Sequence, residues 1–372
     1  MLKRPFIYIL TGLALILISL TIPWQEADPA TAEQPPAASG STLPTTVEIA
    51  WTFKAGDQLK AAPVVHGNRI VVGGTDGYLY CLNRQGELLW KQQTGNAIEG
   101  AALIYRNRVY VGNLSGKVNA YDLNNGRRIW SYDTEYQVSA APVAWSDGTR
   151  YYILVGSYDY KLHALDANTG NRAWVYKSDN YIHAAVAVEG NHAVFGGCDG
   201  HLHVVDIRTG RGVAKTEIAT YIASSPLLDQ GTAFIGDYDG KITAVEYRTG
   251  RIVWTFTAPG RELPFIASPV IVGNRLLAGN RDRHLYCLDK RNGRMLWRFN
   301  TGHRVDAPPL ADNRHVLVAN MRGDLILLTL NSGEVVWRFE LGSPITGRPA
   351  LANGYLFAGT HDGTLYALKP KR

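Results

Sequence analysis

The sequence predicts an all-β fold, an eight-bladed β-propeller made of four-stranded antiparallel blades. Its main support is a phrase of the form small–x–Asp–x–x–x–Gly–x–x–x–Trp, which recurs seven times and is clearest at 120–130 and 164–174. Including a leading Trp51, the last position of the phrase falls at residues 51, 90, 130, 174, 214, 254, 297 and 337. Repeats of about forty residues that each contain several short strands are typical of radial arrays, in which a unit buries its core only against its neighbours.

The fifth repeat illustrates the strands expected in one blade. An apolar run at 221–228 is followed by a turn and a second strand at 233–236. Residues 242–246 alternate as a third strand, and a Gly-containing turn leads into a fourth strand at 252–256. Asp-Gly pairs in several repeats supply the positive φ angles that tight hairpins need. We therefore expect an antiparallel meander, and no segment of the repeat region has helical periodicity.

The two ends of the repeat region are expected to share one blade. The last repeat stops at 365–368 without a fourth strand, whereas 47–51 has the pattern of a fourth strand with no blade before it. Pairing of strand 47–51 with the last repeat would close the ring and remove two open sheet edges. The predicted propeller domain therefore covers 46–372.

Over residues 47–372 the repeats resemble those of quinoprotein (PQQ-type) eight-bladed propellers. A WD-repeat propeller is disfavoured, because no repeat Trp is followed by Asp. The resemblance implies that the outer-strand Trp docks between adjacent blades and that the repeat Gly and Asp are structural. This blade-docking role is assigned to Trp51, Trp90, Trp130, Trp174, Trp254, Trp297 and Trp337. By architecture the chain is also similar to the BamB family, propeller lipoproteins that scaffold outer-membrane protein assembly. That family carries a lipidated Cys after its signal, and here no Cys precedes Cys81.

The amino-terminal segment 1–24 is expected to be a signal-anchor, with a cleaved signal as the alternative. Lys3 and Arg4 precede an uncharged run at 6–22, which as a helix would be about 26 Å long. The small-x-small site at 30–32 lies far beyond this run, so we favour an uncleaved anchor. Positive residues before the run place the propeller outside the cytoplasm, on the periplasmic or extracellular side. Residues 25–45, rich in Pro and Ala, are interpreted as a flexible linker.

Composition excludes little but is consistent with a packed globular body. The formal net charge is +6, with 19% charged and 46% hydrophobic residues, so nucleic acid is not expected as a partner. Cys81 and Cys287 occupy the same position in two different repeats, and Cys198 lies in a third. Because a disulfide requires Cα atoms within about 7 Å, none is expected.

Positions at which the repeats disagree are the best candidates for function. Each innermost strand is expected to begin with a block such as Leu59-Lys-Ala-Ala-Pro63, whose first residue is apolar in all eight repeats and should pack between blades. The next residue should face the central channel, and at that position the repeats have Lys60, Glu99, Ser139, His183, Ala223, Ile266, Asp306 and Thr346. Arg348 stands where its counterparts are mostly Ala or Ser.

The candidate partner- or ligand-binding site is therefore a channel mouth formed by Lys60, Glu99, Ser139, His183, Asp306, Thr346 and Arg348. Opposite charges converging on one mouth could hold a ligand. The alternative is that these side chains are simply solvated at a wet opening. A pair of imidazoles, His201 and His203, lies on one face of a strand, but no third metal ligand is evident.

Catalysis is the main alternative to binding. A quinone–Ca²⁺ site would need oxygen ligands on the metal and a carboxylate base, and the only carboxylates assigned to the channel are Glu99 and Asp306, in repeats two and seven. The alcohol-oxidising members of the quinoprotein family usually have an adjacent Cys-Cys pair and long inter-blade loops, and this sequence has neither. We therefore expect no catalytic, cofactor-binding or metal-binding residues, no cofactor and no bound PQQ.

The predicted function is a membrane-tethered, non-catalytic scaffold that binds a protein partner in the cell envelope. A PQQ- and Ca²⁺-dependent dehydrogenase and an envelope sensor of small ligands are the alternatives. The turns that join first to second and third to fourth strands share one face and are rich in Arg, including Arg69, Arg150 and Arg291. The linker enters from this Arg-rich face, which is therefore expected to lie nearest the membrane and its anionic head groups.

Overall fold

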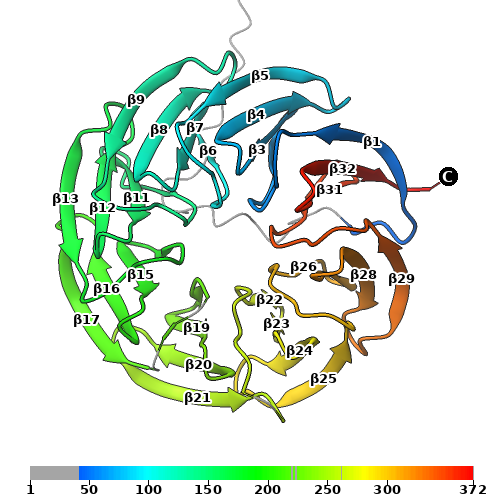
Figure 1. Ribbon diagram of the computed structural model, residues 1–372. Coiled ribbons are helices and arrows are strands. Elements are labelled where there is room, and N and C mark those ends of the chain that lie inside the picture. Colours follow the sequence, from blue (N-terminus) through cyan, green and yellow to red (C-terminus); the bar gives the residue numbers. More distant parts are fainter. Residues whose placement is uncertain (1–41, 219–220, 223, 261, 372) are drawn as a thin grey trace, which may run out of the picture.

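The computed structural model describes residues 42–218, 221–222, 224–260 and 262–371, so the predicted anchor at 1–24 lies outside the described residues. In this part of the chain 32 strands form eight sheets of four, and none of the described residues is helical. Accordingly, nothing within these ranges could span a bilayer as a helix. Figure 1 shows the eight sheets as the blades of a ring.

Blades 1 to 4 follow one another along the chain. Blade 1 contains β2 (Val64–His66), β3 (Arg69–Gly73), β4 (Tyr78–Asn83) and β5 (Leu88–Gln93). Blade 2 contains β6 (Leu103–Tyr105), β7 (Arg108–Gly112), β8 (Lys117–Asp122) and β9 (Arg128–Asp133). Blade 3 contains β10 (Val143–Ser146), β11 (Tyr151–Gly156), β12 (Lys161–Asp166) and β13 (Arg172–Lys177). Blade 4 contains β14 (Ala187–Glu189), β15 (His192–Gly196), β16 (His201–Asp206) and β17 (Arg211–Glu217).

Blades 5 to 8 complete the ring. Blade 5 contains β18 (Leu227–Asp229), β19 (Thr232–Gly236), β20 (Lys241–Glu246) and β21 (Arg251–Thr257). Blade 6 contains β22 (Val270–Val272), β23 (Arg275–Gly279), β24 (His284–Asp289) and β25 (Met295–Asn300). Blade 7 contains β26 (Leu310–Ala311), β27 (His315–Ala319), β28 (Asp324–Thr329) and β29 (Val335–Glu340). Blade 8 contains β30 (Ala350–Ala352), β31 (Tyr355–Gly359), β32 (Thr364–Lys369) and, from the other end of the repeat region, β1 (Glu48–Lys54).

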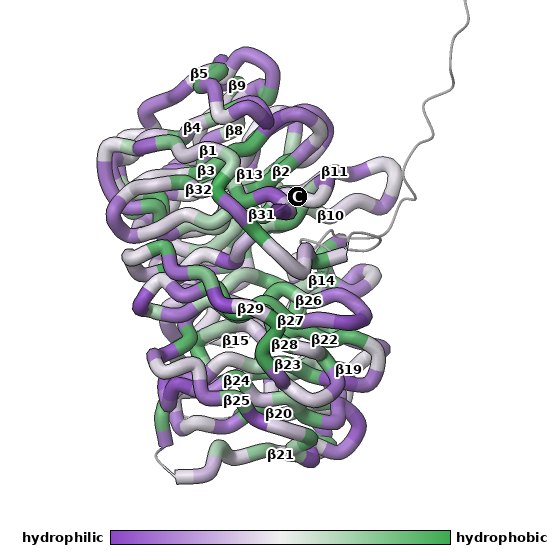
Figure 2. The backbone as a smooth tube through the Cα atoms, turned by 90° about the vertical axis from the view of Figure 1, so that its right-hand side faces the viewer, coloured by the Kyte–Doolittle hydropathy of each residue, from purple (hydrophilic) through white to green (hydrophobic). Residues whose placement is uncertain are grey.

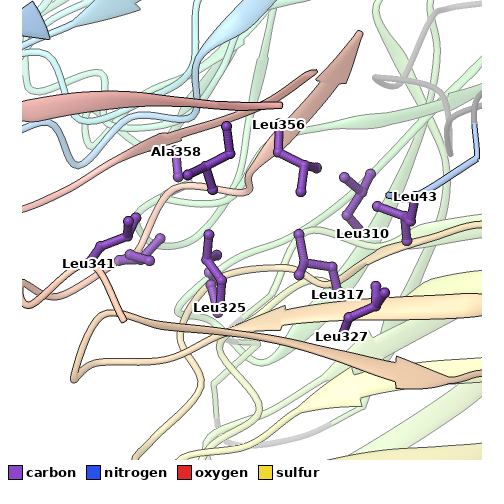
Figure 3. Packing of buried hydrophobic residues seen from close by; sticks show 12 residues of the cluster. Leu43, Leu310, Leu317, Leu325, Leu327, Leu341, Leu356 and Ala358 are labelled. Carbon is purple, nitrogen blue, oxygen red and sulfur yellow. The ribbon is translucent and has the colours of Figure 1, made fainter. Parts of the chain in front are cut away.

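The predicted closure of the ring is confirmed. Strand β1 pairs antiparallel with β32, with Ile49 opposite Leu368 and Trp51 opposite Ala367. It supplies the outer strand that the last repeat lacks, so blade 8 has the order β1-β32-β31-β30. Leu43 is buried in the cluster between blades 7 and 8 together with Leu327 and Leu356 (Figure 3), so the packed body already includes this residue.

One sequence expectation about the innermost strands is wrong. They do not begin with the block that contains Lys60; β2 starts at Val64 and β18 at Leu227, each directly after the Pro that ends its block. Proline has no N–H to donate to a strand ladder, so the block stays outside the sheet and forms a loop. These inner loops connect the fourth strand of one blade to the first strand of the next and lie on the inside of the ring (Figure 1).

The packing between blades follows the repeat. The apolar residue that opens each inner loop is fully buried in every blade: Leu59, Ile98, Val138, Ile182, Ile222, Phe265, Val305 and Ile345. On the outer side, each repeat Trp donates its indole N–H to a backbone carbonyl of the adjoining blade. The acceptors are Arg84 for Trp51, Leu123 for Trp90, Ala167 for Trp130, Ile207 for Trp174, Lys290 for Trp254, Leu330 for Trp297 and Pro44 for Trp337, at 2.7 to 3.1 Å.

The Gly of the repeat is required by the same contact. Gly170 has a φ of +75°, and a Cβ built on it would lie 2.6 Å from the Trp130 ring. The position therefore needs both a left-handed backbone and the absence of a side chain. A single contact thus accounts for two of the three marker residues of the repeat.

Each outermost strand carries a β-bulge directly before the Trp position. In β29, Trp337 pairs with Leu327 and Val335 with Leu328, so Val336 is the extra residue. The other seven blades have the same register shift. Because a bulge interrupts the alternation of a strand, two consecutive side chains can point to solvent there. Val335 and Val336 are both exposed.

Candidate functional site

The inner loops meet the turns between second and third strands at one end of the ring. In blade after blade, the N–H of the second turn residue donates to the carbonyl that precedes the buried loop residue, as in Tyr158 to Gln137 at 2.9 Å and Tyr238 to Tyr221 at 3.2 Å. This repeated bond fixes the position of every candidate side chain. Within a loop, half-buried residues alternate with buried ones, and the candidates occupy the half-buried positions.

The charged candidates are paired. Lys60 Nζ lies 2.8 Å from Glu99 Oε1 across the junction of blades 1 and 2. Asp306 is largely buried and receives two hydrogen bonds from Arg281, at 3.0 and 2.9 Å, with Arg304 at 3.8 Å. The hydrogen bond to Asp306 raises the pKa of Arg281 further above its ordinary value. Both carboxylates are thus neutralised by cations of the protein.

The polar candidates form two further contacts. Thr346 Oγ1 donates to the Lys60 carbonyl at 3.3 Å and lies 2.9 Å from Nε2 of His361, whose pKa is lowered by burial and by nearby Lys60. Ser139 donates to the His183 carbonyl at 3.4 Å, and Nδ1 of His183 lies 3.5 Å from Cys198 Sγ.

Arg348 stands among small residues of the inner loops. The Ala185 N–H donates to Ser225 Oγ at 2.9 Å, and the Ser225 N–H donates to Ser268 Oγ at 3.2 Å, so two of the counterparts of Arg348 hold neighbouring loops together. Burial lowers the pKa of Arg348 to about 10, so its guanidinium remains charged near neutral pH.

The structure does not gather the candidates into one chemical centre. Lys60, Glu99 and Thr346 adjoin one another, whereas Asp306 and the Ser139–His183 pair lie in other blades. Ala223, which shares the channel-facing position, lies outside the described residues. No three His, Cys, Asp or Glu side chains of the described chain are grouped so as to hold a metal ion.

The two histidines of β16, His201 and His203, have hydrogen-bond partners within the protein. His203 Nε2 lies 2.8 Å from Asp199 and its Nδ1 lies 3.0 Å from the Tyr176 hydroxyl, while His201 Nδ1 lies 2.7 Å from the Asp199 carbonyl. Blade 3 repeats the arrangement, with His163 between Asp159 and Tyr132. Burial by itself would raise the pKa of Asp199, but hydrogen bonds led by that from His203 bring it down to about 2. These buried relays therefore hold turns in place.

Sequence reasoning missed a group of exposed tyrosines around the same end of the ring. This tyrosine cluster comprises Tyr136, Tyr158, Tyr160, Tyr181, Tyr221 and Tyr238, on the inner loops and turns of blades 3 to 5. The ring centroids of Tyr158 and Tyr160 each lie 5.0 Å from that of Tyr181, and those of Tyr221 and Tyr238 are 6.1 Å apart. All but Tyr158 are between 37 and 64% exposed. A comparison of the turns across the repeats could have found them.

Tyr160 supplies the clearest of those signals. Its φ is +68°, at a turn position where Gly77, Gly116 and Gly200 stand in other blades. A side chain in the left-handed region is uncommon and carries a conformational cost. Blade 6 has a second side chain at this position, Arg283 at a φ of +77°, and the Tyr160 ring is exposed beside Tyr181.

The Arg-rich face is largely occupied by its own contacts. Arg150 pairs with Asp147, Arg208 with Asp206 and Arg291 with Asp289. Arg69 donates to the Leu123 carbonyl at 3.0 Å, and Arg108 donates to carbonyls of the next blade. Many guanidinium groups of this face thus pair with acidic side chains or cap turns, while the Arg208 and Arg291 side chains remain 48 and 69% exposed.

The whole propeller matches one family model, described as outer membrane protein assembly factor BamB, over residues 41–180, 158–298 and 281–372. The chain belongs to this family. A search of curated proteins gave no match.

Solved structures show how widely the BamB-like fold is shared. BamB from Moraxella catarrhalis superposes with a TM-score of 0.73 at 18% identity, covering 88% of this chain and 98% of that one. A europium-containing methanol dehydrogenase gives a TM-score of 0.69 at 13% identity, covering 87% and 93%. A computationally designed protein, Ika8, gives 0.73 at 17% identity, covering 84% and 96%. Since an assembly factor, an enzyme and a design share this ring, the likeness establishes the fold alone.

Proposed function

We propose that this BamB-family chain is a non-catalytic scaffold, tethered to a membrane of the cell envelope by its amino-terminal segment, that docks a protein partner on the tyrosine cluster. The observation that carries the proposal is the clustering of six tyrosines, five of them exposed, on adjoining blades at one end of the ring. Tyrosine is enriched at protein interfaces, because its ring buries a large area at little entropic cost while its hydroxyl finds a partner.

The position of the linker supports this orientation. Leu43 donates its backbone N–H to Asp312, in the turn between β26 and β27, at 2.6 Å. In an antiparallel meander that turn lies at the opposite end of the blade from the turn between second and third strands. The tyrosine cluster therefore lies away from the end at which the chain enters, where a partner from the surrounding compartment could reach it.

The quinone–Ca²⁺ alternative fits this chain poorly. Glu99 and Asp306, the two carboxylates proposed for such a site, are each bound by a cation and stand on blades 2 and 7. A metal ligand or a catalytic base here would first have to lose Lys60 or Arg281 as its partner. The same residues are well suited to hold neighbouring inner loops together.

Site-specific photo-crosslinking in native membranes tests the scaffold proposal. A photoreactive residue at Tyr181 or Tyr221 should capture a discrete protein, and the same residue at Val213, an exposed rim position of blade 4, should not. Binding of that partner to the purified full chain should weaken at least about tenfold in Tyr181→Ala and Tyr221→Ala. A Lys60→Ala/Arg348→Ala double variant would measure the contribution of the neighbouring charged candidates.

Two results would count against the proposal. Equal capture at Tyr181 and Val213 would show that the cluster is not an interface. Dye reduction by the full chain supplied with PQQ, Ca²⁺ and an alcohol would favour the dehydrogenase instead.

A further inference from the structure

The outer rim of blades 6, 7 and 8 exposes an unusual number of aliphatic side chains. Met295, Leu296, Val335, Val336 and Ile49 are between 37 and 47% exposed. They occupy the bulge of the outermost strand in three adjoining blades. Contiguous apolar surface on a soluble body usually marks a place where something else covers it.

The same position differs on the other side of the ring. Blade 2 has Arg128 and a half-buried Ile129, and blade 3 has Arg172 and Ala173. Blades 1, 5, 6 and 7 expose two consecutive aliphatic residues at the bulge, at 88–89, 252–253, 295–296 and 335–336, whereas blade 8 exposes Ile49 alone and blade 4 exposes Val213 alone. Exposed aliphatic residues therefore occupy the bulge in six of the eight blades, and blades 2 and 3 lack them.

Cations border this patch. Arg298 in β25 and Arg338 in β29 follow the repeat Trp on the exposed side of their strands. The Arg338 guanidinium lies 5.5 Å from the Phe299 ring, which holds it across the two outer strands. A pattern of aliphatic residues, a half-buried Trp and a neighbouring cation is suited to the boundary between acyl chains and anionic head groups.

The chain enters the body in the middle of this arc. Leu43 and Pro44 pack between blades 7 and 8, beside Trp337. The predicted anchor at 6–22 is separated from them by only the 19 residues 23–41. A flexible coil of that length has a root-mean-square span of about 24 Å. An anchor in the bilayer would thus keep this side of the rim close to the lipid surface.

From these observations we propose that the rim of blades 6 to 8 contacts an anionic bilayer directly, edge on, beside the junction of blades 7 and 8 at which the chain enters the body. This rests on the proposed tether and adds a second attachment that orients the ring. Figure 2 looks onto this side of the molecule, with β29 and β1 on the rim. With the rim on the lipid, the tyrosine cluster of blades 3 to 5 points into the aqueous compartment.

The test places one environment-sensitive fluorophore on the full chain in liposomes of phosphatidylcholine and phosphatidylglycerol. Val336→Cys labels the bulge of blade 7, and Ala173→Cys labels the equivalent bulge of blade 3, directly opposite in the ring. Both are made with Cys198→Ala, since Cys81 and Cys287 are buried. The probe at 336 should shift to the blue and be quenched by nitroxide-labelled lipid, and the probe at 173 should stay aqueous.

Failure of the rim proposal and failure of the tether proposal would give different results. If the chain floats with the liposomes but both probes remain aqueous, the rim proposal is overturned and the tether stands. If the chain does not float at all, both proposals fail. A blue shift at 336 that grows with protein density and is insensitive to nitroxide-labelled lipid would assign the patch to a second copy of the chain and overturn lipid contact. A further variant carries the fluorophore at Leu296→Cys together with Val335→Ser and Val336→Ser. If nitroxide-labelled lipid quenches this probe less than it does without the two serines, the aliphatic side chains hold the rim to the bilayer.

Discussion

Blades 3 and 4 and blades 7 and 8 lie on opposite sides of the ring and are built from the same strands in the same register. They differ within the third strands, at the loops and turns, and on the rim. Blades 3 and 4 carry buried Asp–His–Tyr relays with the histidine on the third strand, and exposed tyrosines on their inner loops and turns, whereas blades 7 and 8 have Arg322 and His361 at those turns and aliphatic residues on the rim. Contacts between blades constrain the apolar interior of each repeat, so the two sides differ at loops, turns and bulges and at the third-strand position that carries His163 and His203.

The largest predicted effect concerns the Gly–Trp contact, which recurs at six of the junctions between blades. Gly170→Ala and Gly333→Ala would each place a Cβ against the indole of the preceding blade, at 2.6 and 2.8 Å, on a left-handed backbone. We expect each to lower the free energy of unfolding by about 3 kcal/mol, from overpacking added to backbone strain. Denaturant unfolding measures this, and the two opposite sides should respond alike.

Gly190→Ala and Gly354→Ala are the matched controls. Both positions also have positive φ, at +58° and +79°, but a Cβ there would meet nothing within 4 Å. Each should lose only about 1 kcal/mol. If Gly170→Ala were no worse than Gly190→Ala, the Trp contact would not be what requires Gly in the repeat.

The second prediction concerns the relay found in blades 3 and 4 alone. Asp199 is buried, and its pKa falls from an ordinary value near 4 to about 2. Such a depressed pKa contributes about 2 kcal/mol of stability above pH 4, which is lost as the pH falls through 4 toward 2. Asp199→Asn should therefore be less stable than the parent at pH 7, with the difference shrinking by pH 2.

The blade 7 counterpart sharpens this comparison. Arg322 occupies the same turn position as Asp199 and pairs with Glu340, with both side chains about half exposed. Arg322→Gln should change the free energy of unfolding by less than about 0.5 kcal/mol at pH 7. An equal effect of the two substitutions would mean that burial does not distinguish the two sides.

The fold could be predicted from the sequence because its determinants repeat. The spacing of Gly170 and Trp130 from their neighbours reports a contact that recurs at six junctions between blades, and strand 47–51 has the pattern of the missing outer strand. The bulge before each Trp was not foreseen, since a bulge changes register without changing composition. The innermost strands were placed too early, because the apolar block before Pro226 has the hydrophobicity of a strand but lacks its hydrogen bonds.

The candidate site was harder to read. Comparison of the eight repeats at one loop position identified Lys60, Glu99 and Asp306 as unusual. It could not show that each of these charges already has a partner on another blade. Tyr181 and Tyr238 come from different loops, and only folding brings them to one end of the ring. Ion pairs and side-chain clusters that join different blades depend on which residues are neighbours in space. The sequence of a single repeat carries no information about those neighbours.

A smaller effect is predicted for the tyrosines of the relays. The Tyr132 hydroxyl lies 3.1 Å from His163 Nδ1, and Tyr176 makes the same contact with His203. Tyr132→Phe and Tyr176→Phe should each lower the free energy of unfolding by about 1 kcal/mol, the net value of one hydrogen bond. Tyr136→Phe, in the exposed cluster, should leave it unchanged within error. A loss at Tyr136 as large as at Tyr132 would contradict the division between structural and surface tyrosines.

The last prediction leaves stability untouched and reports access to the loops of blade 4. Burial raises the pKa of Cys81 and Cys287 to about 12, and Cys198, half-buried beside His183, also has a raised pKa. Since only a thiolate reacts, a maleimide added to the native full chain at pH 8 should modify Cys198 alone, more slowly than free cysteine. Mass spectrometry should find one maleimide adduct on the native parent chain and none on native Cys198→Ser. The unfolded parent chain should carry three. Modification of Cys81 at the rate of Cys198 would mean that the packing between blades opens as readily as the inner loops.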